Sequence, residues 1–117
     1  MAKYETALTG NFDELLAQLN NGILSGSISA TLEDSTEVQS DNTRCAVRVY
    51  ERYSMMGENR VSMNITLLGE GDNLYVVAIT AGGSQAVFLK FNTIGEENFL
   101  LQAENIVENY KKSKQRR

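Results

Sequence analysis

Residues 43–91 decide the fold, and they read TRCAVRVYERYSMMGENRVSMNITLLGEGDNLYVVAITAGGSQAVFLKF. Four stretches of this segment alternate apolar and polar side chains with a period of two, and short turn sequences separate them. Such alternation predicts strands with one buried face, and short turns predict antiparallel neighbours. The segment is therefore predicted to form an antiparallel meander.

Three turn sequences predict the registers of this meander, namely Gly82-Gly83 and the loops over residues 69–72 and 54–58. The two glycines fit a two-residue hairpin loop, because glycine readily adopts the positive φ that such turns require. The resulting pairs include Val49–Met63, Leu67–Leu74 and Val76–Leu89. All three registers agree on one apolar face, which a one-residue slip would disrupt. The face consists of Cys45, Val47, Val49, Val61, Met63, Ile65, Leu67, Leu74, Val76, Ala78, Val87, Leu89 and Phe91.

The residues before the meander predict a short strand and a helix. Residues 2–9 can form a strand, with Tyr4, Thr6 and Leu8 on one face. Asn11 suits a helix N-cap and Glu14 stands at the capping-box position. Apolar side chains follow at helical spacing, namely Phe12, Leu15, Leu16, Leu19 and Ile23. The helix is predicted to end near Gly22 or Gly26, and the pattern does not choose between them.

Two further segments complete the predicted elements. Residues 27–33 alternate again and predict a strand, whereas the polar, acidic residues 33–42 predict a turn or a frayed strand extension. Thr93 and Glu96 form a second capping box, which predicts a C-terminal helix. Its apolar stripe comprises Phe99, Ala103, Ile106 and Tyr110.

The predicted order is strand, helix, five strands and helix (β-α-β-β-β-β-β-α). Both helices are amphipathic, so both are expected to cover the apolar face of the sheet. We therefore predict a two-layer α+β fold, in which an antiparallel meander is covered on one face by an N-terminal helix and a longer C-terminal helix. The 117 residues are predicted to form a single domain, residues 1–117.

Two stretches of the meander carry a resemblance to a known family. They read RCAVRVYERY (residues 44–53) and GGSQAVF (residues 82–88). Here and over most of its length, the chain resembles a family of short bacterial proteins of unknown function. The resemblance implies a bacterial origin and assigns no activity or site. The element order alone is similar to a reduced helix-grip fold and to the halves of TATA-binding proteins, a likeness that does not indicate function.

The composition argues against several classes of protein. A net charge of −4 disfavours a general nucleic-acid binder. The single cysteine cannot form an intramolecular disulfide and suits a reducing compartment. The first residues do not resemble a signal peptide, and the apolar runs are too short to span a membrane. We therefore predict a cytoplasmic protein without a membrane segment.

Catalytic and metal-binding patterns are not found in the sequence. The chain contains no histidine, which argues against histidine-dependent nucleophilic sites and removes the commonest zinc ligand. Cys45 falls on the predicted core face, where a thiol behaves as a small hydrophobic group. The acidic cluster in residues 33–41 lacks the ligand pattern of a calcium loop. Gly82-Gly83-Ser84 lies between predicted strands, whereas a phosphate loop precedes a helix. We predict no catalytic residue, metal site or cofactor.

The sheet face opposite the helices is the predicted interaction surface. Half of it is basic and polar, and the other half is aromatic and aliphatic. A contiguous apolar patch of roughly a few hundred Å² often marks an interaction site, although scattered apolar side chains are normal on protein surfaces. The predicted interface residues are Arg48, Tyr50, Arg52, Arg60, Tyr75, Val77, Ile79 and Phe88.

Two functions from different classes remain open. The first is a non-enzymatic protein that acts through protein contact, as a homodimer formed by the exposed sheet face. The alternative is a carrier or sensor of a small apolar ligand, held between the sheet and the C-terminal helix. Such a cavity would be lined by Met63, Phe91, Phe99, Ile106 and Tyr110. Bases stacked on the aromatic and arginine side chains are a further mode, which the acidic charge disfavours.

Overall fold

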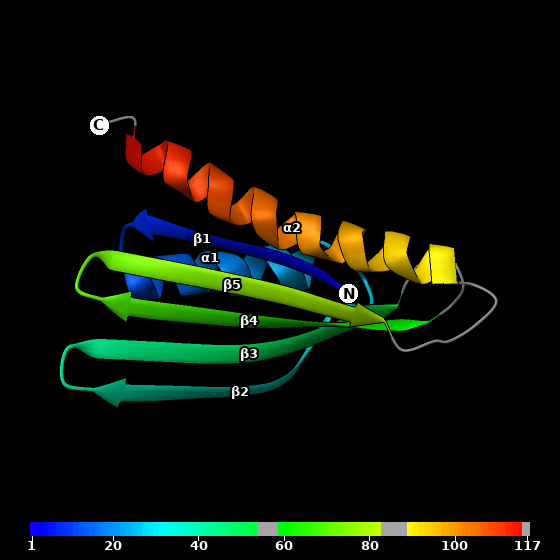
Figure 1. Ribbon diagram of the computed structural model, residues 1–117, viewed down its shortest axis with the longest axis horizontal. Coiled ribbons are helices and arrows are strands. Elements are labelled where there is room, and N and C mark those ends of the chain that lie inside the picture. Colours follow the sequence, from blue (N-terminus) through cyan, green and yellow to red (C-terminus); the bar gives the residue numbers. More distant parts are fainter. Residues whose placement is uncertain (54–58, 83–88, 116–117) are drawn as a thin grey trace.

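The computed structural model describes residues 1–53, 59–82 and 89–115. Its elements are β1 (Ala2–Thr9), α1 (Phe12–Ser25), β2 (Thr31–Ser40), β3 (Thr43–Tyr53), β4 (Arg60–Glu70), β5 (Asn73–Gly82) and α2 (Leu89–Gln115). The strands form one antiparallel sheet in the order β1-β5-β4-β3-β2 (Figure 1). The predicted α+β fold with its antiparallel sheet is thereby confirmed.

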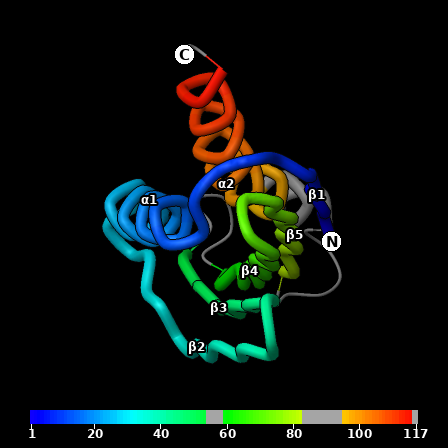
Figure 2. Tube along the Cα trace, turned by 90° about the vertical axis from the view of Figure 1, so that its left-hand side faces the viewer, coloured from blue at the N-terminus to red at the C-terminus, as the bar shows by residue number. Residues whose placement is uncertain are grey.

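Both helices lie on the same side of the sheet, which we call the inner face; the opposite side is the outer face. Helix α2 packs on β1, β5 and β4, and α1 packs on α2 and β4. Strand β2 lies at the far edge of the sheet, away from the helices (Figure 2). The helix layer therefore covers the β1–β5–β4 side well and ends near β3.

Helix α1 begins as its sequence predicts. The side chain of Asn11 accepts a hydrogen bond of 2.9 Å from the backbone N–H of Glu14, which satisfies a free donor of the first turn. The helix ends at Gly26, the second of the two predicted positions. Gly22 lies inside it, where a Cβ would approach Ile106 Cδ1 to 2.6 Å. The glycine thus permits the close approach of α1 and α2.

Helix α2 begins earlier than predicted. It starts at Leu89, so Thr93 lies inside the helix and does not cap it. The predicted strand over residues 84–91 is wrong for Leu89–Phe91, and residues 83–88 lie outside the described part of the chain. Short apolar runs do not distinguish strand from helix by spacing alone. The sheet of the described residues therefore has five strands instead of the predicted six.

The turn between β4 and β5 is tighter than predicted. Glu70 pairs with Asn73, and Gly71 adopts a left-handed φ of 59°, which suits glycine. Leu67 consequently pairs with Val76, two residues beyond the predicted partner. Because side chains alternate with a period of two, this shift keeps the predicted faces of both strands.

The register between β3 and β4 differs from the prediction by one residue, with a larger consequence. Met63 pairs with Tyr50 and not with Val49. A shift of one residue moves every side chain of a strand to the opposite face. Cys45, Val47 and Val49 therefore lie on the outer face, and the prediction that they belong to the core is wrong.

Strand β2 is displaced along the chain relative to the prediction. It covers Thr31–Ser40, so much of the segment predicted as a turn or frayed extension is a regular strand. A two-residue turn at Asp41-Asn42 joins it to β3, and Asp41 has a φ of 50°. All ten residues of β2 are exposed. Their polar character fits an edge strand outside the helix layer, where charged side chains discourage uncontrolled pairing.

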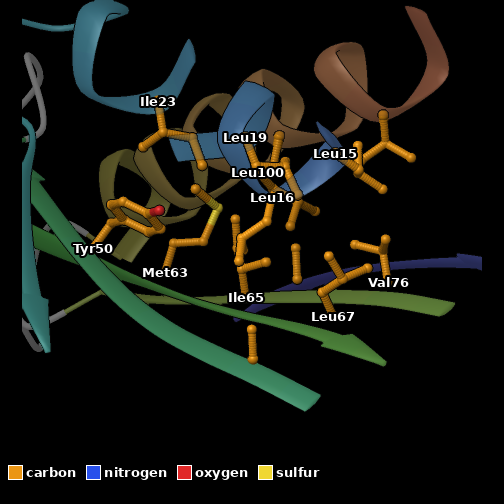
Figure 3. Packing of buried hydrophobic residues seen from close by; sticks show 14 of the residues in the cluster. Leu15, Leu16, Leu19, Ile23, Tyr50, Met63, Ile65, Leu67, Val76 and Leu100 are labelled. Carbon is orange, nitrogen blue, oxygen red and sulfur yellow. The ribbon is translucent and has the colours of Figure 1, made fainter. Parts of the chain in front are cut away.

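The core lies between the helices and the inner face of β1, β5 and β4, and Ala46 and Tyr50 of β3 complete it (Figure 3). Leu15, Leu19 and Ile23 of α1 point toward Met63, Ile65 and Leu67 of β4. Helix α2 contributes Phe99, Leu100, Ala103, Val107 and Tyr110. The predicted inner faces of β4 and β5 are confirmed by this arrangement, and Tyr4, Thr6 and Leu8 of β1 share one face as predicted.

Candidate functional site

The outer face of the sheet is the candidate site, because α1 does not cover it. Figure 1 views the molecule from this face, and α1 lies behind the strands. The side chains of the outer face form rows that cross all five strands in the order β1, β5, β4, β3, β2. The first row, nearest the two hairpin turns, is Ala7, Tyr75, Leu68, Cys45 and Val38. The second row is Glu5, Val77, Thr66, Val47 and Thr36. The third row is Lys3, Ile79, Asn64, Val49 and Asp34.

These rows hold a group of apolar side chains that we call the outer patch. It consists of Val38, Cys45, Val47, Val49, Leu68, Tyr75, Val77 and Ile79. Four of them are large and exposed, at 59% for Val38, 42% for Leu68, 40% for Tyr75 and 37% for Ile79. The other four are half-buried between neighbouring strands. The patch is broader than the predicted one, because it extends across β3 to the edge strand β2.

The far end of the outer face is charged. Arg60 forms ion pairs with Glu51 at 2.5 Å and with Glu33 at 3.4 Å, and its guanidinium lies over the ring of Tyr53. Ser62 donates a hydrogen bond of 3.2 Å to Glu51. At the edge of the patch, the negative charge of Glu5 raises the pKa of the Tyr75 hydroxyl. The outer face therefore has an apolar end and a charged end.

The predicted interface residues are divided between the two faces of the sheet. Tyr75, Val77 and Ile79 lie on the outer face as predicted, and Arg60 lies at its charged end. Phe88 lies outside the described residues. Arg48, Tyr50 and Arg52 were predicted on the outer face, and this is wrong, because the one-residue shift of β3 turns them toward the helices.

The misassigned side chains of β3 hold the strand against the helix layer. Tyr50 is 1% exposed and donates a hydrogen bond of 2.8 Å to Asn20 of α1, and burial raises the pKa of its hydroxyl. Arg52 lies 4.6 Å from the centre of the Phe99 ring and donates to Gln102, and burial lowers the pKa of its guanidinium. Long side chains of this kind bury their stems while the polar ends find partners at the rim.

Arg44 extends the same rim toward the start of α1. Its guanidinium binds Asp13 through two hydrogen bonds of 2.9 and 3.1 Å and lies 4.1 Å from the centre of the Phe12 ring. The guanidinium lowers the pKa of the Asp13 carboxyl. In the part of the chain that is described, the Arg48 Nε between these anchors is buried without a hydrogen-bond partner. Arg44 and Arg52 of β3 thus fasten the strand to the helices and, like Arg48, are not available to an outer partner.

The β3 and β2 members of the patch and Leu68 were not predicted to face outward from the sequence. Leu67 and Leu68 are adjacent in a strand, so one of them had to face outward; this signal was available in the sequence. Val47 and Val49 were missed because their face depends on the register between β3 and β4, which differs from the predicted one by one residue. Val38 was missed because its segment was expected to leave the sheet.

The residues of the alternative ligand cavity lie mostly in the core. Met63, Phe99 and Tyr110 are buried, Ile106 is partly buried, and the side chain of Phe91 lies outside the described part. A groove of about 670 Å³ lies elsewhere, between the end of β1 and the last turns of α2. It is lined by Ala7, Leu8, Thr9, Gly10, Asn11, Asp72, Lys111, Lys114 and Gln115.

Metal ligands do not gather among the described residues, which contain no group of three or more cysteine, aspartate or glutamate side chains able to hold an ion. Within the same ranges, no helix has the length and apolar character needed to cross a membrane.

The comparisons with known proteins identify the family over nearly the full length of this α+β chain. Its sequence model matches residues 1–111. The chain belongs to DUF6054, a family of unknown function. The predicted membership of a family without a known activity is confirmed. No curated protein and no solved structure matches this DUF6054 member.

Proposed function

We propose that this DUF6054 member is a non-enzymatic cytoplasmic protein that acts through protein contact, as a homodimer formed by the outer patch. The observation that carries the proposal is the orientation of β3. Its aliphatic side chains Val47 and Val49 face away from the helices, while its arginines face toward them. Apolar surface left in water forfeits roughly 25 cal/mol per Å², so a partner surface that covers these valines would be favoured.

The area of the three rows, which contain the outer patch and the polar side chains between and beside it, suits a modest interface. Three rows across five strands span about 500 Å² per copy, given strands about 4.8 Å apart and about 6.8 Å between side chains on one face. Two copies together would bury about 1,000 Å², near the lower bound for a specific interface. We therefore expect association that depends on protein concentration.

The test is the mass in solution, measured by light scattering over a range of concentrations. Wild type should approach twice the chain mass of 13.0 kDa. Val77→Glu and Val47→Glu should give folded monomers, because each would bury an unpaired carboxylate of either copy in the interface. The matched control is Gln18→Glu on the exposed side of α1, which should leave the dimer intact.

Cys45 offers a second readout, because it belongs to the patch and is half-buried. Its thiol should react with a maleimide more slowly in the wild-type dimer than in the Val77→Glu monomer. A wild type that remains monomeric at high micromolar concentration, with equal thiol rates in both proteins, would contradict the proposal. Loss of the dimer in Gln18→Glu would place the interface elsewhere.

A further inference from the structure

The side chains of the outer face are similar in kind on the two sides of β4, which is the middle strand of the five. Immediately beside β4, β5 and β3 both present apolar side chains in all three rows. At equal distance on the two flanks stand Tyr75 and Cys45, Val77 and Val47, and Ile79 and Val49.

The two edge strands are matched in the first and third rows. The first row ends in Ala7 on β1 and Val38 on β2, which are both apolar. The third row ends in Lys3 on β1 and Asp34 on β2, which carry opposite charges. A surface of this pattern is complementary to its own copy when its two flanks are exchanged.

We propose that two copies pack outer face against outer face, with the two-fold axis parallel to β4; this inference rests on the homodimer proposed above. Rotation by 180° about this axis exchanges the flanks and keeps each row at its level. Val77 then meets Val47 of the copy, and Lys3 meets Asp34 of the copy. The strands of the two sheets run in similar directions, offset by their twist, which is a common packing class for sheets.

The perpendicular axis, along the second row, gives a poorer match. It keeps each strand opposite its own copy and exchanges the first row with the third. Leu68 would then meet Asn64, Val38 would meet Asp34 and Ala7 would meet Lys3. Apolar side chains would face polar or charged ones in three of the five strands, at a desolvation cost without a compensating partner.

One contact, between Arg60 and Arg60 of the copy, disfavours the proposed axis, but ion pairs within each copy reduce the repulsion. Arg60 lies on β4, so the axis brings it toward its own copy at the charged end. In each copy Arg60 is already paired with Glu51 and Glu33, which neutralise its charge. Because the sheets are twisted, side chains far from the second row lie farther from their counterparts in the copy. The contact is therefore made by the outer patch and not by the charged end.

The experiment uses the edge residues of the second row, Glu5 and Thr36, in the full chain with Cys45→Ser. Single variants Glu5→Cys and Thr36→Cys are treated, alone and mixed, with a short bis-maleimide that spans about 10 Å, the separation of packed sheets. The proposed axis places Glu5 opposite Thr36 of the copy. Only the mixture should then give covalent dimers in high yield, and these should contain one chain of each kind.

The other outcomes separate the possible failures. Cross-linking of each variant with itself would overturn the proposed axis in favour of the perpendicular one. A dimeric protein without cross-links in any sample would overturn the axis and move the contact away from the outer face. A monomeric protein would overturn the homodimer itself, which light scattering of the untreated samples reports separately.

A charge exchange supplies an independent measurement. Lys3→Glu should weaken the dimer by roughly two- to five-fold, as expected for an exposed ion pair. Adding Asp34→Lys to Lys3→Glu should restore the wild-type dissociation constant. Failure of this restoration, with both single variants weakened, would overturn the contact between Lys3 and Asp34.

Discussion

Strands β3 and β4 are neighbours of equal length, yet they orient their aliphatic side chains in opposite ways. On β4 the apolar residues face the helices and the polar residues face outward. On β3 the valines face outward, and the inner face carries arginine, alanine and tyrosine. The difference follows from position, because the helix layer covers β4 and ends near β3.

The inner face of the sheet therefore requires apolar side chains at β4 and side chains with polar ends at β3, only one strand spacing away. Beneath the helices, a side chain is stabilised by apolar contact on all sides. At the rim, a side chain needs an apolar stem and a polar end, which arginine and tyrosine provide. The outer valines of β3 then remain for another surface, and this is the physical basis of the proposed dimer.

The largest expected effect concerns β4. Ile65→Ala should lower the free energy of unfolding by about 2–5 kcal/mol, because it removes a fully buried side chain and leaves a cavity. Thr66→Ala on the outer face should change it by less than about 0.5 kcal/mol. Urea unfolding of both variants measures the contrast. Equal losses would mean that the two faces of β4 do not differ as described.

A smaller effect is expected at the rim. Tyr50→Phe removes the hydrogen bond to Asn20 and should lower the free energy of unfolding by about 0.5–1.5 kcal/mol. Tyr53→Phe is the matched control, since Tyr53 is exposed on the same strand. Thermal and urea unfolding should show a loss in the first variant alone. A loss of equal size in Tyr53→Phe would remove the distinction between the two positions.

The smallest effect is expected at Arg48, which pairs with Ile65 across the two strands. Arg48→Met keeps most of the stem and removes the buried Nε that lacks a partner in the described residues. The free energy of unfolding should stay within about 1 kcal/mol of wild type or rise, because a buried unsatisfied donor is costly. A clear loss in urea unfolding would show that the guanidinium of Arg48 fastens β3, as those of Arg44 and Arg52 do.

The sequence by itself determined the elements whose signals are local. Asn11 and Glu14 mark the start of α1 through a cap that lies within four consecutive residues. The faces of β4 follow from its alternation and those of β5 from the hairpin register, and they survive the two-residue error at their turn because the side-chain period is two. The two-layer α+β arrangement follows in turn from two amphipathic helices and one apolar sheet face.

Only the tertiary structure decided the face of β3, the extent of β2 and the start of α2. The alternating arginines and valines of β3 allow either face inward, and the choice depends on how far the helix layer reaches. Strand β2 is polar because neither face is covered, so its hydrophobic pattern is weak. These features depend on contacts between segments that are distant in sequence. Hydrophobic periodicity indicates which side of a strand is buried, but it does not indicate whether a helix or another surface covers that side.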